Sequence, residues 1–133
     1  MVELQKDIEI ELAKYLLEKV EHVKYPATCT YKDAVLELGK RLGRPVNAHF
    51  GLRHPLGKIL ELCFELDLPL LSALLYKSTG GKQQGAGEGF YTLAREFKPQ
   101  YKDMSPFDAW KQELALIRAC EDWTPLRNYL DKC

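Results

Sequence analysis

The sequence predicts a mainly α-helical fold with a small β element, and three observations support this prediction. Apolar residues recur at three- and four-residue spacing in several segments, which is the period of a helix buried on one side. Serine, threonine or proline stands where several of these segments begin. One short apolar segment precedes a glycine-rich stretch, TGGKQQGAGEGF, Thr79 to Phe90. With 133 residues, the chain is expected to form a single domain, 1–133.

The first predicted helix covers residues 1–24. Its sequence, MVELQKDIEIELAKYLLEKVEHV, has charges at short intervals, so we expect neither a signal peptide nor a membrane span. Helical spacing predicts that one face is buried, formed by Leu4, Ile8, Leu12, Tyr15, Leu16, Val20 and Val23. This helix is predicted to end before Tyr25 and Pro26.

Two further helices are predicted in the first half of the chain. Thr30, with Asp33 three residues later, is typical of a helix N-cap, and Gly43 and Pro45 mark the end of that second helix. Pro55 suits the first turn of a third helix, which Pro69 ends. Its buried face is predicted to comprise Leu56, Ile59, Leu60, Cys63 and Leu66.

The second half begins with LLSALLYK, which its length and apolar character predict to be a strand. After the glycines, FYTLAREF is predicted to be a short helix. Ser105 and Pro106 predict the start of a longer helix, and Thr124 is predicted to cap a last helix from Pro125 to Lys132. The inner face of the longer helix is predicted to hold Phe107, Trp110, Leu114, Ile117 and Cys120.

This order of elements predicts a winged helix-turn-helix-like core. Two helices, a strand-like segment and a glycine loop follow one another as in that fold, with the third helix against DNA and the loop as the wing. The core is expected to span residues 25–93, preceded by the helix in 1–24 and followed by a C-terminal helical cap in 104–133.

The glycine stretch permits two interpretations. Glycines before a helix can bring backbone N–H groups close to a phosphate, which would indicate nucleotide binding. However, GAGEG lacks the G-x-G-x-x-G spacing, and Glu88 places a carboxylate among the donors. A loop or hairpin wing is therefore favoured, with Lys82 as its candidate contact to a polyanion.

A basic segment precedes it in the chain. GKRLGRPVNAHFGLRHPLGK, from Gly39 to Lys58, contains no acidic residue, although the chain as a whole is neutral. Such a segment suits a phosphate backbone or an acidic partner. A solvated face that complements the negative end of the second helix is the alternative, which does not account for Arg53. The candidate contacts are Lys40, Arg41, Arg44, Arg53, His54 and Lys58.

Residues from Tyr25 to Leu93 also resemble a known module. YPATCTYKDAVLELG, RHPLGKILELCFELDLPLLSALLYKSTGG and GEGFYTLA resemble a small module of bacterial and phage proteins that sometimes precedes HNH-type nuclease domains. The same order is more distantly similar to the DNA-binding domain of alkylguanine-DNA alkyltransferases and alkyltransferase-like proteins. Thr30 and Tyr31 match that family's T-Y, and HPLG from His54 falls where its R-A-V-G would lie.

The resemblance implies a winged-helix fold and DNA binding, with Tyr31 among the contacts. It does not imply alkyl transfer, because PLLSALLYK stands where the family has P-C-H-R and contains neither cysteine nor histidine. The chain also contains no HNH segment. The module is thus expected to act without a nuclease domain of its own.

We expect a cytoplasmic, non-enzymatic DNA-associated recognition module that uses no cofactor. No catalytic motif is readable, and the cysteines and histidines lack metal-site spacing. The main alternative is a small phage-type inhibitor of a host defence system, anti-restriction or anti-CRISPR-like, that binds a host defence protein. Its candidate surface is acidic and comprises Glu3, Asp7, Glu9, Glu11 and Glu18. Small-ligand or nucleotide binding by the glycine loop is the third possibility.

Overall fold

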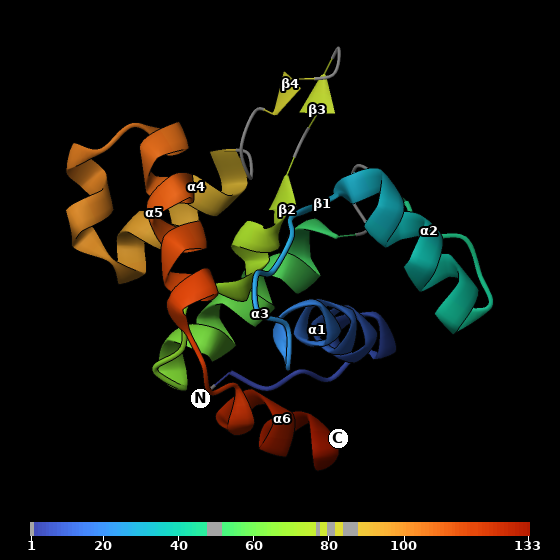
Figure 1. Cartoon of the computed structure of the whole chain (residues 1–133). Coiled ribbons are helices and arrows are strands. Elements are labelled where there is room, and N and C mark those ends of the chain that lie inside the picture. The colour runs from blue at the N-terminus through green and yellow to red at the C-terminus, as the bar shows by residue number, and fades with distance from the viewer. Residues whose placement is uncertain (1, 48–51, 77, 80–81, 84–87) are drawn as a thin grey trace.

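A computed structural model of the chain describes residues 2–47, 52–76, 78–79, 82–83 and 88–133. These residues are mainly helical, as the sequence predicts, and the strands among them are two residues long. Helix α1 (Asp7–Val20) lies against the helices α2 (Tyr31–Leu42), α3 (Arg53–Glu65) and α6 (Thr124–Asp131) (Figure 1). The apolar face of α1 is therefore the centre of the core, and Leu12, Leu16 and Leu17 are fully buried there.

The predicted helix boundaries are confirmed where a specific capping contact exists. The Asp33 amide donates to Thr30 Oγ1 at 3.1 Å, and the Asp108 amide donates to Ser105 Oγ at 3.1 Å. Gly43 ends α2 in the left-handed conformation, with φ of 67°, which glycine adopts without a steric penalty. The predicted Thr124 cap is wrong, because α6 begins at Thr124 and Asp122 Oδ1 accepts from the Thr124 amide at 2.9 Å.

The segment predicted to be one strand is mostly a 3₁₀ helix. Helix η1 (Leu71–Leu74) is followed by the strand β2 (Leu75–Tyr76), which pairs in parallel with β1 (Cys29–Thr30). Leucine and alanine favour helical over extended backbone, and the Ser72 hydroxyl anchors the turn by donating to the Leu56 carbonyl at 2.6 Å. Among the described residues of this segment, the strand prediction is therefore confirmed only for Leu75 and Tyr76.

A small hairpin projects from the helical body (Figure 1). It consists of β3 (Ser78–Thr79) and β4 (Lys82–Gln83), which pair antiparallel with Thr79 opposite Lys82. The sequence predicts a loop or a hairpin here, and the described strands form a hairpin. The rest of that stretch, residues 80–81 and 84–87, lies outside the described residues.

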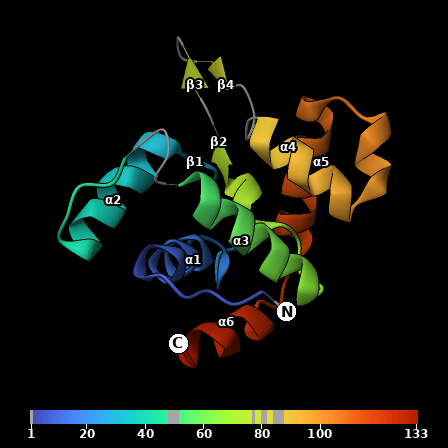
Figure 2. The ribbon, with the colours of Figure 1, turned by 180° about the vertical axis from the view of Figure 1, so that it is seen from behind.

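Helix α4 (Glu88–Phe97) packs against α3, and α5 (Pro106–Ala119) packs against α4 and η1. Figure 2 shows α4 beside α3, and η2 (Pro99–Asp103) leads into α5. Two residues predicted to be buried are exposed: Val23 at 42%, because α1 already ends at Val20, and Phe107 at 45%, because it lies in the first turn of α5 at the surface.

A buried carboxylate fixes α5 in place. Glu113 is fully buried and accepts hydrogen bonds from the Leu70 amide at 2.6 Å and from Lys98 Nζ at 2.8 and 2.9 Å. The Tyr101 hydroxyl also donates to it, and both burial and this hydrogen bond raise the pKa of Tyr101. One side chain of α5 therefore joins η2, the end of α4 and the segment before η1.

Replacing Glu113 with alanine is expected to lower the free energy of unfolding by about 3–5 kcal/mol, because Lys98 would lose its partner in a mostly buried position. Glu96→Ala, at an exposed position of α4, is the control and should change it by less than about 0.5 kcal/mol. Urea unfolding followed by circular dichroism measures both variants. Similar losses in the two would contradict a central role for Glu113.

Candidate nucleic-acid interface

The fold divides the basic segment into paired and unpaired cations. Arg41 Nη1 and Nη2 lie 2.8 and 2.9 Å from the two carboxylate oxygens of Glu18, and Arg41 Nε lies 3.2 Å from Glu37 Oε1. Arg44 binds both carboxylate oxygens of Asp7 at 2.8 Å. The contacts with Glu18 and Asp7 are two-pronged and join α1 to the last turn of α2 and the residue just after its cap, so both guanidinium groups already have anionic partners.

The pKa shifts follow from these contacts. The hydrogen bonds from Arg44 hold the pKa of Asp7 below its ordinary value, and the Asp7 carboxylate raises the pKa of Arg44 in turn. Hydrogen bonding to Glu18 likewise raises the pKa of Arg41. These contacts therefore favour the charged forms of Asp7, Arg41 and Arg44.

Lys58 is also held against α1. Its Nζ lies 3.5 Å from Glu9 Oε1 and donates to the Glu3 carbonyl at 3.0 Å. This ammonium joins the first turn of α1 and the segment before it to α3, and only part of it faces solvent. Lys58 thus mainly links α3 to the N-terminal region, and only part of its charge is available at the surface.

Arg53 and His54 have a different environment. Both lie in the first turn of α3 and are exposed, His54 with 69% of its side chain accessible. Within the described part of the chain, no carboxylate forms an ion pair with Arg53. The N-terminal end of the α3 dipole adds to the positive electrostatic potential of this turn. This turn is therefore the part of the basic segment that is most open to an external anion.

An open cavity of about 380 Å³ adjoins this turn, between α3 and α4. Arg53, His54 and Lys58 supply positive charge to its wall, whereas Glu61 supplies a carboxylate and Gly57 and Leu93 supply apolar surface. The cavity is charged mainly at the end nearer the start of α3. A phosphate or carboxylate is the ligand that this part of the wall would attract.

The hairpin lies on the same side of the molecule as this turn. The Ser72–Leu56 hydrogen bond places η1 against the beginning of α3, and η1 continues through β2 towards β3. In Figure 2 the N-terminal ends of α3 and α4 both face the hairpin end of the molecule. Lys82 is in β4, although its side chain lies outside the described part of the structure.

The remaining predicted contacts lie elsewhere. Lys40 is exposed near the C-terminal end of α2, which points away from the hairpin (Figure 1). Tyr31 is the first residue of α2 and is partly buried, which raises the pKa of its phenol. The structure thus brings Arg53, His54 and Lys58 together in one cavity wall, whereas Arg41 and Arg44 pair with carboxylates of α1.

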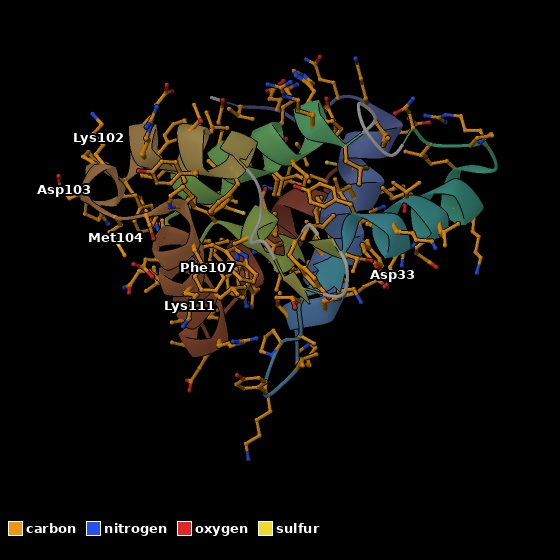
Figure 3. The ribbon with its side chains drawn as sticks, turned by 90° about the horizontal axis from the view of Figure 1, so that it is seen from above. Asp33, Lys102, Asp103, Met104, Phe107 and Lys111 are labelled. Carbon is orange, nitrogen blue, oxygen red and sulfur yellow. The ribbon has the colours of Figure 1, made fainter. Side chains whose placement is uncertain are left out.

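The structure also shows a surface that the sequence did not indicate. The Phe107 ring lies 5.6 Å from the Trp110 ring, Trp110 lies 6.4 Å from Tyr76, and Lys111 Nζ lies 5.6 Å from the centre of the Phe107 ring. Figure 3 shows Phe107 and Lys111 on α5, across the hairpin from Asp33 of α2. An aromatic residue in the exposed first turn of a helix was the available signal, but helical spacing had assigned Phe107 to the core.

Among the described residues, no group of three or more histidine, cysteine, aspartate or glutamate side chains is arranged to hold a metal ion. None of the described helices has the length and apolar character needed to cross a membrane. Comparison with known protein families, curated proteins and solved structures found no match. The family resemblance in residues 25–93 therefore stays a prediction.

Arg41→Gln is expected to lower the free energy of unfolding by about 0.5–1 kcal/mol, because it removes a partly buried member of a network with Glu18 and Glu37. The loss should shrink in concentrated salt, which screens the wild-type pairs. Lys40→Gln, at the exposed neighbouring position, is the control and should have little effect. Urea unfolding at low and high salt makes the comparison, and equal losses would argue against the network.

Proposed function

We propose that the chain is a non-enzymatic, DNA-associated recognition module with a winged-helix-like core. The observation that carries this proposal is the exposed first turn of α3, where Arg53 and His54 face solvent while Arg41 and Arg44 are paired within the chain. A free guanidinium at the positive end of a helix is suited to a phosphate oxygen. Releasing counterions from DNA would favour that contact.

The order of elements supports the same proposal. Helix α1, strand β1, helices α2 and α3, strand β2 and a hairpin follow one another as in a winged helix, where the helix before the hairpin contacts DNA. The hairpin then corresponds to the wing and carries Lys82. Lys40 would be a peripheral contact, and Tyr31, at the start of α2, a contact only if the duplex reaches β1.

The proposed interface is smaller than the sequence suggested. With Arg41 and Arg44 paired and Lys58 held by α1, two or three phosphates are within the reach of the α3 turn. Contacts with that number of phosphates give a slope of about −2 to −3 in a plot of log affinity against log salt concentration. We therefore propose weak, salt-sensitive DNA binding.

Binding to a protein partner remains the second candidate function, but on a different surface. The acidic face that the sequence predicts for it is occupied in the fold, because Glu18 pairs with Arg41, Asp7 pairs with Arg44 and Glu9 faces Lys58. The exposed Phe107 ring beside Trp110 is instead the surface that favours it. Large aromatic side chains are enriched in the centres of protein interfaces.

Arg53→Ala is expected to weaken binding of a short mixed-sequence duplex about tenfold and to reduce the salt slope by about 0.9, because one phosphate contact is lost. Arg44→Ala is the matched control, since the same residue type in the same segment is paired with Asp7. It should leave the slope unchanged. Fluorescence anisotropy at several salt concentrations measures both.

Two results of that titration would count against DNA binding. One is the absence of any wild-type binding at low salt, and the other is an equal response of the Arg53 and Arg44 variants. A Phe107→Ala variant separates the second candidate function, because it should leave DNA affinity unchanged and reduce only binding to a protein.

A further inference from the structure

Glu9 is a buried carboxylate with one oxygen satisfied and one not. It is fully buried, and its Oε1 accepts from the amides of Gln5 and Lys6 at 2.9 and 3.2 Å. Its Oε2 is also buried and has no hydrogen-bond partner among the described residues. A buried ionised oxygen without a donor is unfavourable, so such an atom commonly marks the place of a missing contact.

Glu9 is nevertheless held in its charged form. Burial raises its pKa, but the amides of Gln5 and Lys6 and the ammonium of Lys58 together lower it below its ordinary value. The Glu9 side chain therefore places a buried anion between α1 and α3. It needs a further donor at Oε2.

His54 is a candidate donor to this oxygen. Its Nε2 lies 3.9 Å from Glu9 Oε2, just beyond hydrogen-bond distance, and its exposed side chain is free to move closer. The other charged groups around the imidazole are Arg53, Lys58 and Glu61 on α3, and α4 contributes the apolar Leu93. On the N-terminal side, the Glu3 carbonyl is already bonded to Lys58.

We propose that Glu9 is a positioning residue for the first turn of α3. In this proposal, protonated His54 donates a hydrogen bond to the buried Oε2 of Glu9. Protonation makes both ring nitrogens donors, so the contact becomes a charge-assisted hydrogen bond. The carboxylate also offsets repulsion between the imidazolium and its neighbours Arg53 and Lys58. Without Glu9, three cations would line one cavity wall with only Glu61 to oppose them there.

For function, this inference rests on the proposed DNA binding. A proton on His54 adds a positive charge beside Arg53, so DNA affinity should be higher at about pH 6 than at about pH 8. The contact between Glu9 and His54 is itself independent of DNA. Its existence and its use can therefore be tested separately.

The contact is tested by a double-mutant cycle with Glu9→Gln and His54→Gln, read by urea unfolding at about pH 6 and about pH 8, on the two sides of the histidine range. Glutamine keeps an oxygen for the amides of Gln5 and Lys6, and His54 is exposed, so both variants should fold. We expect a coupling of about threefold in the unfolding constant at the lower pH, lost at the higher pH. A cycle with Glu61→Gln, the other carboxylate of the cavity, is the control and should show no coupling.

The use of the contact is tested by duplex binding over the same pH range. Wild-type affinity should increase on acidification, His54→Gln should abolish that increase, and Glu9→Gln should reduce it. Absence of Glu9–His54 coupling at both pH values would overturn the inference. Coupling without any DNA binding would support the contact and overturn the proposed function instead.

Discussion

The two faces of α1 hold the rest of the structure in register. One face supplies fully buried leucines to the core, and burial of such side chains contributes about 1.5–3 kcal/mol each. The edge of the same helix carries carboxylates that pair with Arg41 of α2, with Arg44 just beyond the end of α2, and with Lys58 of α3. An exposed pair such as Arg44 with Asp7 adds little energy individually, but together these contacts fix how α2 and α3 lie on α1.

This complementarity also determines which charges are available for function. A neutral chain with an acidic first helix and a basic segment might present two opposite surfaces, one for a protein and one for DNA. Instead, the two sets of charges largely pair with each other within the chain. Among the described residues of the basic segment, Arg53 in the first turn of α3 is the arginine without an ion pair. A small interface next to a hairpin is what remains.

The aromatic and buried polar groups of the C-terminal half play a different part. Glu113 satisfies a lysine, a tyrosine and a backbone amide at once, and the Trp110 indole donates to the Ala73 carbonyl at 2.8 Å. These contacts attach α5 to η1, the segment that leads through β2 to the hairpin. The hairpin and the α3 turn are thereby held on a common framework, which any joint contact with a partner would require.

The sequence by itself determined the helices, because helical spacing of apolar residues and local caps such as Thr30, Gly43 and Ser105 depend only on neighbours in the chain. It also indicated the hairpin position and the basic segment. It misjudged η1, Val23 and Phe107, since burial of a short apolar run or a terminal turn depends on what packs against it. Only the tertiary structure decided which cations are free, because an ion pair such as Arg44 with Asp7 joins residues far apart in sequence that meet only after α1 and α2 have packed.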